Sequence, residues 1–282
     1  MKNTNHKKVL KKLFRKKLSV IGSAILIVVI FISVFSSALA PYDYTEINPI
    51  AAKKAPSAEH LFGTDELGRD VLSRIMAGAS VTFTVGFVAV AFALVIGTAL
   101  GLIAGFYGGK VDAVISSVAD AIWSFPNIIL ALVITTAIGA GMKSVILAIG
   151  IVYVPGFTRI VRNMTLSVRE MEYVMGARAV GLNNAEIITR YILPNVFPTI
   201  IVQTSLYSAQ AMLTESTLSF MGLGITAPQV SWGLMLKSGF TFIRIAPWLV
   251  IVPSVAILLT VLGLNFLGDG LRDALDVKIG DD

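Results

Sequence analysis

Long apolar runs alternate with short polar segments along almost the whole chain. A helix needs about 20 mainly apolar residues to cross a hydrocarbon core of about 30 Å. Six such runs can be placed in the sequence, at about 18–39, 81–106, 111–138, 144–157 with a further turn or two, 196–222 and 246–267. The pattern predicts an all-α polytopic membrane protein with six transmembrane helices.

Composition agrees with this fold class and excludes several kinds of function. The chain is 55% hydrophobic and 14% charged, whereas soluble domains carry about 25% charged residues. It has no cysteine, and His6 and His60 lie outside the apolar runs, so we expect neither disulfides nor a metal centre. No GxxxxGKS or GxxxxGKT loop and no HExxH motif occurs, so the chain is expected not to be an enzyme and not to hydrolyse nucleotides itself.

The distribution of charge predicts the topology. Eight basic and no acidic residues occupy the first eighteen positions, and Arg159, Arg162 and Arg169 follow the fourth run. Cytoplasmic segments are enriched in Lys and Arg, so both segments are expected in the cytoplasm, and with six spans both termini as well. The basic residues thus indicate topology, not a nucleic-acid partner. Ala38-Leu39-Ala40 resembles a signal-peptide cleavage site, but the preceding run is long enough to be retained as a span.

The chain divides into four parts, which are a basic cytoplasmic tail (1–17), a first transmembrane helix with an outer loop (18–80), a core of five transmembrane helices (81–270) and a cytoplasmic tail (271–282). Near the end of the outer loop, apolar and charged residues separate onto opposite faces of a helix. The apolar face holds Val71, Leu72, Ile75 and Met76, and the charged face holds Arg69, Asp70 and Arg74. This pattern predicts a short helix on the outer membrane surface with a solvated charged face.

Glycine and proline positions predict how the spans pack and bend. Gly97 and Gly101 have the GxxxG spacing that lets two membrane helices approach closely. Pro155 and Pro253 are expected to kink the fourth and sixth spans.

Two spans carry polar residues at helical spacing. In the third span these are Ser116, Asp120, Ser124 and Asn127, and in the fifth they are Gln203, Tyr207, Gln210, Thr214 and Thr217. Polar side chains facing lipid are costly, so such stripes indicate a translocation path or a buried polar network. We assign the fifth-span stripe, together with Asp120, Ser124 and Asn127, to a translocation path. Glu215 lies about 100° around the helix from Thr214 and is assigned to the path or to a neighbouring helix.

Residues 169–195 are too polar for the membrane interior, yet they show helical periodicity. Val174, Ala177 and Val180 recur at helical spacing, and further apolar residues do so after Gly181. Gly181 can form a left-handed corner, and Asn183 with Glu186 has the form of a capping box. We predict two short amphipathic helices that meet at Gly181, the second stopped or kinked by Pro194.

This segment carries a family resemblance. Gly-Ala-Arg-Ala-Val-Gly (176–181) and Tyr-Ile-Leu-Pro-Asn (191–195) resemble the EAA loop of bacterial ABC-importer permeases, the cytoplasmic coupling helix that docks on the ATPase. The string at 62–74, FGTDELGRDVLSR, resembles a signature of the C-type subunit of dipeptide, oligopeptide and nickel permeases, and residues 215–224 resemble a further family string. The chain departs from the family at Met175, where a glutamate is usual, which leaves Glu172 to supply that charge.

The resemblance implies a type I ABC-importer permease in a bacterial inner membrane. It assigns ATPase coupling to Glu172, Ala177, Arg178, Gly181, Ile187, Ile188, Tyr191, Leu193, Pro194 and Asn195. Its implied partners are a homologous second permease subunit, two ATP-binding subunits and an extracytoplasmic substrate-binding protein. ATP and magnesium would be held by the ATP-binding subunits, with no cofactor in this chain.

Three alternatives remain at this stage. The same architecture could carry nickel or a metal chelate, although the shortage of histidine and cysteine favours peptides. A secondary transporter or channel acting alone would predict more intramembrane carboxylates or an inverted repeat. A membrane enzyme or assembly scaffold has no catalytic residues to support it.

Overall fold

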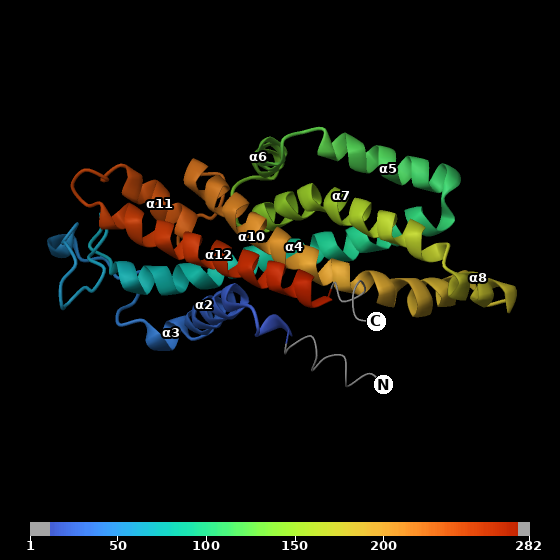
Figure 1. Ribbon diagram of the computed structural model, residues 1–282. Coiled ribbons are helices and arrows are strands. Elements are labelled where there is room, and N and C mark those ends of the chain that lie inside the picture. Colours follow the sequence, from blue (N-terminus) through green and yellow to red (C-terminus); the bar gives the residue numbers. More distant parts are fainter. Residues whose placement is uncertain (1–11, 276–282) are drawn as a thin grey trace.

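The computed structural model describes residues 12–275, and over these residues the fold is helical, without strands. In chain order the elements are α2 Lys17–Val34, α3 Ser36–Leu39, η1 Pro49–Ala51, α4 Val71–Tyr107, α5 Gly109–Trp123, α6 Asn127–Ile138, α7 Met142–Arg169, α8 Glu172–Ala179, α9 Asn184–Glu186, η2 Ile187–Ile192, α10 Leu193–Met221, α11 Trp232–Phe240 and α12 Trp248–Leu275. The long helices form an elongated bundle, with α8 projecting from one end (Figure 1). The predicted all-α fold is confirmed.

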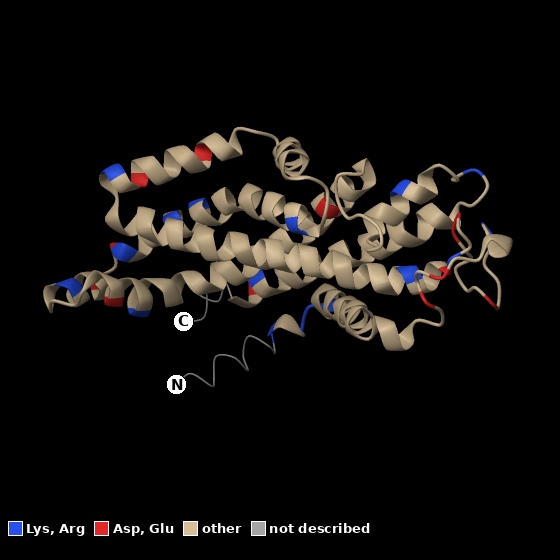
Figure 2. Ribbon diagram, turned by 180° about the vertical axis from the view of Figure 1, so that it is seen from behind, with Lys and Arg blue, Asp and Glu red and all other residues tan. Residues whose placement is uncertain are grey.

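Five helices are long and apolar enough to cross a membrane, and the bent pair α5–α6 makes a sixth if it counts as one span. Most charged residues gather at the two ends of the bundle, and its middle is largely free of them (Figure 2). Lys16 and Asp273 form an ion pair, so the start of α2 and the end of α12 lie at the same end of the bundle. Residues 1–11 and 276–282, which hold most of the two predicted tails, lie outside the described part.

The centre of the bundle is the seam between α4 and α7. A side chain built at Gly97 would place its Cβ 2.5 Å from the Cβ of Phe157, and one at Gly101 would lie 2.6 Å from the carbonyl oxygen of Thr158. Only glycine fits at these distances, so the two backbones can touch. The close packing predicted from the GxxxG spacing is confirmed.

The predicted surface helix before the second span does not exist. Residues 71–80 are the first turns of α4, which runs unbroken to Tyr107. The Asp70 carboxylate accepts a hydrogen bond from the Ser73 amide (2.7 Å) and so caps the helix. Gly78 lies against Trp232, whose indole nitrogen donates to the carbonyl of Ile75 (2.9 Å). These turns are therefore covered by α11, a helix between the predicted fifth and sixth spans, rather than by lipid head groups.

The third span is broken. α5 and α6 are bent by 89° across Ser124, Phe125 and Pro126. Proline donates no amide hydrogen bond and disfavours helix at the residue before it, so the helix ends ahead of Pro126. Ser124 caps the end of α5 and Asn127 begins α6, which means that the predicted continuous stripe from Ser116 to Asn127 is wrong.

The fifth span begins earlier than predicted. α9, η2 and α10 together form a continuous helical element from Asn184 to Met221. Pro194 lies in the first turn of α10 and directly follows the π-helical turns of η2, so it neither stops nor separates a second short helix. Proline has no amide hydrogen, so one backbone carbonyl in the preceding turn loses its donor. A π-helical turn shifts the hydrogen-bond register and lets that carbonyl find another donor.

Candidate functional site

The loop between α7 and α10 has the predicted glycine corner. Gly181 has φ +85°, and its amide donates to the Arg178 carbonyl (3.0 Å) while the Leu182 amide donates to Ala177 (3.2 Å), which closes the end of α8. Asn183 then accepts a hydrogen bond from the Glu186 amide (2.9 Å), and its side-chain nitrogen donates to the Glu186 carboxylate (2.9 Å). The residues predicted to turn and cap this loop do so.

The inner face of the loop is anchored in the bundle. Val174, Ala177, Ile187 and Ile192 are buried in the same apolar cluster as residues of α4 and α7. The Arg178 guanidinium lies 5.0 Å from the centre of the Phe106 ring at the end of α4. The inner face of α8 is therefore in direct contact with α7 and with the end of α4.

The remaining coupling residues lie along the continuous helix. Ile188, Tyr191 and Leu193 are half-buried against the core, and Pro194 is exposed. The Asn195 side chain donates to the Tyr191 carbonyl (2.6 Å). This arrangement fixes the loop to the start of α10.

The outer face of the loop carries an apolar surface that sequence reasoning missed. We call Met171, Tyr173, Met175 and Val180 the loop patch, and all four side chains are exposed. Val180, which the periodicity placed on the same face as Val174, is 84% exposed because α8 ends at Ala179. Met175 occupies the position of the usual family glutamate, and this replacement of a charge by an apolar side chain was the sequence feature that could have indicated the loop patch. Exposed apolar groups beside Glu172 and Glu170 suit a protein partner.

The predicted path residues of α10 face α7 and the α5–α6 pair. Tyr207 packs between Tyr153 and Phe157 of α7, with ring centres 5.1 Å and 5.0 Å apart. The Tyr153 and Thr214 hydroxyls lie 3.1 Å apart. Gln203, Thr214 and Thr217 are partly exposed along this stripe, and Gln210 is exposed.

Asp120 and Ser124 lie at the end of α5, where two ion pairs connect α5 to α7. The Arg159 guanidinium donates to Asp120 (2.6 Å) and stacks 4.2 Å from the centre of the Trp123 ring. Nearer the α4–α5 turn, Arg162 makes a bidentate contact with the Asp112 carboxylate. Its Nε donates to one oxygen and its Nη2 donates to the other at 2.6 Å. Ser124 and Asn127 are exposed beside the first pair. The arginines that marked the cytoplasmic side in the sequence therefore belong to α7 itself and hold α5.

Glu215 is not exposed toward any path. Its side chain is completely buried and accepts a hydrogen bond from Ser219 (2.7 Å) and a longer one from Ser216 (3.4 Å). The hydroxyls of Thr82 on α4 and Ser231 at the start of α11 also lie beside the carboxyl group. Ser219 in turn accepts from the Ile225 amide (3.0 Å). Of the two predicted placements, the neighbouring helix is correct, and the assignment of Glu215 to the path is wrong.

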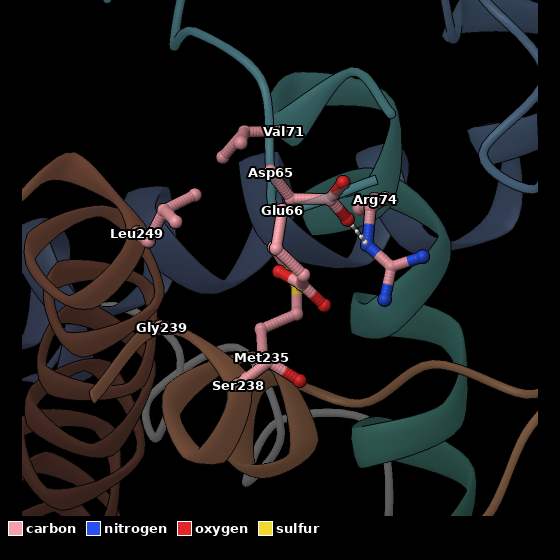
Figure 3. A pocket seen from close by; sticks show the side chains of 8 residues that line it. All are labelled: Asp65, Glu66, Val71, Arg74, Met235, Ser238, Gly239 and Leu249. Carbon is pink, nitrogen blue, oxygen red and sulfur yellow. Dashed lines mark ion pairs between the residues drawn. The ribbon is translucent and has the colours of Figure 1, made fainter. Parts of the chain in front are cut away.

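The charged residues of the outer loop are not a solvated face. Asp65 and Arg74 are buried, with 3.3 Å between the Arg74 Nε and the carboxylate. Figure 3 marks this ion pair with a dashed line. Asp65 also receives the Arg69 guanidinium (2.7 Å), and Asp70 lies 3.0 Å from the ring of His60. Leu249, Met235 and Ser238 of the two last helices surround this ionic cluster, so the predicted solvated face is wrong.

Within residues 12–275, no three or more His, Cys, Asp or Glu side chains are grouped so that they could hold a metal ion. The ionic contacts described above pair carboxylates with arginines or His60 instead.

Two family models match the chain. One, described as "Binding-protein-dependent transport system inner membrane component", matches residues 97–281, and one described as "N-terminal TM domain of oligopeptide transport permease C" matches residues 6–56. Together these matches cover the first span and the bundle from residue 97 of α4 onward, and they leave residues 57–96 unmatched.

Curated relatives match over almost the whole length. The chain is 46% identical to the dipeptide transport system permease protein DppC of Alkalihalophilus pseudofirmus, covering 95% of this chain and 88% of the relative. It is 39% identical to the probable D,D-dipeptide transport system permease protein DdpC of Escherichia coli, covering 93% and 88%. It is 38% identical to the glutathione transport system permease protein GsiD of Pectobacterium atrosepticum, covering 95% and 90%.

The fold resembles a solved structure of the MetNI methionine ABC transporter in an inward-facing conformation. The TM-score is 0.60 at 20% identity, and the match covers 72% of this chain and 97% of the other. At this identity the likeness concerns the fold.

Proposed function

The chain belongs to the family of inner membrane components of binding-protein-dependent transport systems, and we propose that it is the permease subunit of an importer of short peptides. The observation that carries the substrate class is the 46% identity to a dipeptide permease over 95% of the chain. Relatives named for oligopeptides, D,D-dipeptides and glutathione support the same class. They favour peptides over the nickel alternative.

The geometry of the coupling loop supports the proposal that separate subunits hydrolyse ATP and dock on this loop. Its inner face is fixed to the bundle by Val174, Ala177, Ile187 and Ile192, whereas the loop patch is exposed. A rigid element with a free apolar face is suited to docking on a partner. Two ATP-binding subunits, which hold ATP and magnesium, dock on Glu172 to Asn195 in this proposal, and their closure moves the loop as a rigid body.

The other partners follow from the same family. A homologous second permease subunit completes the path, and a substrate-binding protein delivers peptide to the outer side, where the Asp65 cluster lies. The chain sits in the bacterial inner membrane with the α8 end in the cytoplasm. The two termini are placed on that same side, as the basic amino-terminal tail predicts.

The first experiment is co-purification in mild detergent, followed by reconstitution. Tagged chain should bring down a second permease and an ATPase, and proteoliposomes should take up radiolabelled dialanine when binding protein and ATP are present. A chain that elutes alone and still moves solute would overturn the importer and favour a secondary transporter or channel.

Coupling is tested at the glycine corner. Gly181→Asp should leave assembly intact, because a side chain there meets nothing within 4 Å, yet place a new charge beside the docking surface. We expect more ATP hydrolysed per dialanine imported. Gly181→Asn is the matched control, since both residues carry the same strain at positive φ and only Asp adds charge. Normal uptake and stoichiometry in Gly181→Asp would count against docking at this corner.

A further inference from the structure

The ion pair between Asp120 and Arg159 is unusually open. The Arg159 side chain is 49% exposed and that of Asp120 is 61% exposed, although they lie 2.6 Å apart. The contact is made by one guanidinium nitrogen and one carboxylate oxygen. Much of the hydrogen-bonding capacity of both groups therefore remains free.

This pair lies inward of the end of the bundle at which α4 stops. On α7, Arg159 follows Thr158, which packs against Gly97 and Gly101 of α4. α4 continues to Tyr107, so the pair lies about 12 Å inside the end of that helix at 1.5 Å per residue. Val118, on the opposite side of α5 from Asp120, is an exposed apolar residue suited to lipid. Two half-exposed charges at this depth need water or a polar partner on the Asp120 side of α5.

The surroundings of the pair are polar and aromatic. Trp123 stacks on the Arg159 guanidinium at 4.2 Å. Gly156, one turn earlier on the same side of α7, has no side chain, and this lets the Tyr207 hydroxyl approach to 2.0 Å from where a Cβ would be. Arg159 thus adjoins the α10 stripe of Gln203 and Tyr207. One surface built from α5, α7 and α10 carries an anion, a cation and aromatic rings.

The neighbouring pair provides a contrast within the same two helices. Arg162 and Asp112 are only 28% and 17% exposed and make a two-pronged contact, to which Ser116 adds a hydrogen bond (3.0 Å). That pair is built to hold α5 against α7. The Asp120–Arg159 pair also joins α5 and α7, but with a single contact between more exposed groups, so it can exchange partners more easily.

We propose that Asp120 and Arg159 are a binding station for the two charged ends of a peptide in transit. A short peptide with free termini carries an ammonium group and a carboxylate. Arg159 exchanges the Asp120 carboxylate for that of the peptide, and Asp120 receives the peptide ammonium, so each charge keeps a partner throughout. After the peptide leaves, the two side chains pair again. This inference rests on the proposed peptide importer.

The test uses the complete transporter, reconstituted with its second permease, ATPase subunits and binding protein. The variant Asp120→Asn with Arg159→Gln keeps side chains of similar size that can hydrogen-bond, but removes both charges. We expect dialanine uptake to fall by about tenfold or more, with assembly and binding-protein-stimulated ATPase activity retained. The matched control, Asp112→Asn with Arg162→Gln, removes the same two charges from the structural pair and should stay within about twofold of wild type, because amide side chains can still hydrogen-bond between α5 and α7.

A second measurement asks whether water reaches the station, using the absence of cysteine in this chain. Ser124→Cys lies about one turn beyond Asp120 and should react with a charged, membrane-impermeant thiol reagent, more slowly during dialanine transport. Val118→Cys, about 200° around α5 from Asp120, should not react.

The possible outcomes distinguish failure of the binding station from failure of the proposed peptide-importer function. If wild type imports dialanine and the Asp120–Arg159 variant does so equally well, or if both double variants lose uptake alike, the station is wrong and the importer stands. An unreactive Ser124→Cys would also overturn the station. If wild type transports no peptide at all, the proposed function fails and the station fails with it.

Discussion

Glu215 links three helices, because the hydroxyl groups around its carboxyl group belong to α4, to α10 and to the start of α11. A carboxylate inside a span must face protein or water, and that much follows from the sequence. The choice between the two depends on Thr82 and Ser231, which come from helices far away in the chain. The four hydroxyl groups around Glu215 become visible as a set only once α4, α10 and α11 are packed together.

We expect Glu215→Leu to destabilise the protein by about 1–3 kcal/mol for each hydroxyl left buried without a partner. Ser219 and Ser231 keep their contacts with the Ile225 and Leu234 amides, so Ser216 and Thr82 are the groups most affected. Glu215→Gln keeps an acceptor and similar volume and should cost far less. The melting temperature in detergent, followed by loss of the monodisperse peak in size-exclusion chromatography, measures both. Equal melting temperatures would contradict a hydrogen-bonding role for Glu215.

At the scale of elements, the sequence predicts where apolar helices exist better than where they end. Apolar periodicity runs from 111 to 138, and Pro126 was the only sign of a break, whereas the direction of the 89° bend depends on the packing of α6 against α7. At α4 the sequence predicted a boundary that does not exist. Residues 71–80 have the pattern of a separate amphipathic helix, but they are the first turns of α4. Their charged face is satisfied by the buried cluster of Asp65 and Arg69, which no local pattern indicates.

The glycine seam gives an element-scale prediction. Gly101→Leu should prevent α4 and α7 from closing, because even the Cβ would lie 2.6 Å from the Thr158 carbonyl oxygen. Overpacking of this kind costs about 1–3 kcal/mol, and more where backbone must move. Ala91→Leu, on the exposed side of α4, is the control and should be tolerated. The amount of folded protein in the membrane fraction checks this, and comparable yields would argue against a tight seam.

At the scale of the whole molecule, the ionic cluster ties the outer loop to the last helices. Asp65 is its centre, since it accepts from the amides of Leu67 and Arg69 as well as from the guanidiniums of Arg69 and Arg74. The Trp248 indole nitrogen adds a hydrogen bond to the Thr64 carbonyl (3.2 Å). Residues 62–74 thus form a clasp, by which we mean the ionic cluster around Asp65 together with the Thr64–Trp248 hydrogen bond. It joins the outer loop to helices more than 150 residues later in the chain.

Asp65→Ala should open this clasp more than Arg74→Met does. Losing Asp65 leaves Arg74 without its carboxylate and Arg69 with only the longer contact to Glu66 (3.3 Å), at a cost of about 3–5 kcal/mol for the broken buried pair, whereas Asp65 keeps Arg69 when Arg74 is replaced. Tryptic cleavage at Lys53 and Lys54 of purified protein, followed by mass spectrometry, reports loop opening. Faster cleavage in Arg74→Met than in Asp65→Ala would reverse this order and place the clasp elsewhere.

Coupling over the length of the molecule depends on the continuous helix that starts at the loop. From Asn184 to Met221 it spans about 57 Å at 1.5 Å per residue, from the coupling loop past the path stripe. The sequence predicted the loop and the α10 stripe as separate features and placed a break at Pro194 that would have isolated them, whereas the helix is continuous there. Without that break, a movement of the loop reaches Gln203 and Tyr207 directly, provided that the helix stays stiff.

Stiffness can be varied at two exposed positions in η2, Thr189 and Arg190. Replacing both with glycine should soften the helix, because each glycine costs about 1 kcal/mol of helix stability relative to alanine. Replacing both with alanine removes the same side chains and keeps the helix. We expect the glycine pair to raise the ATP consumed per dialanine imported, with ATPase activity preserved, and the alanine pair to behave as wild type. If both pairs couple normally, force reaches the path through α4 and α7, where Arg178 and Ala177 already contact the bundle.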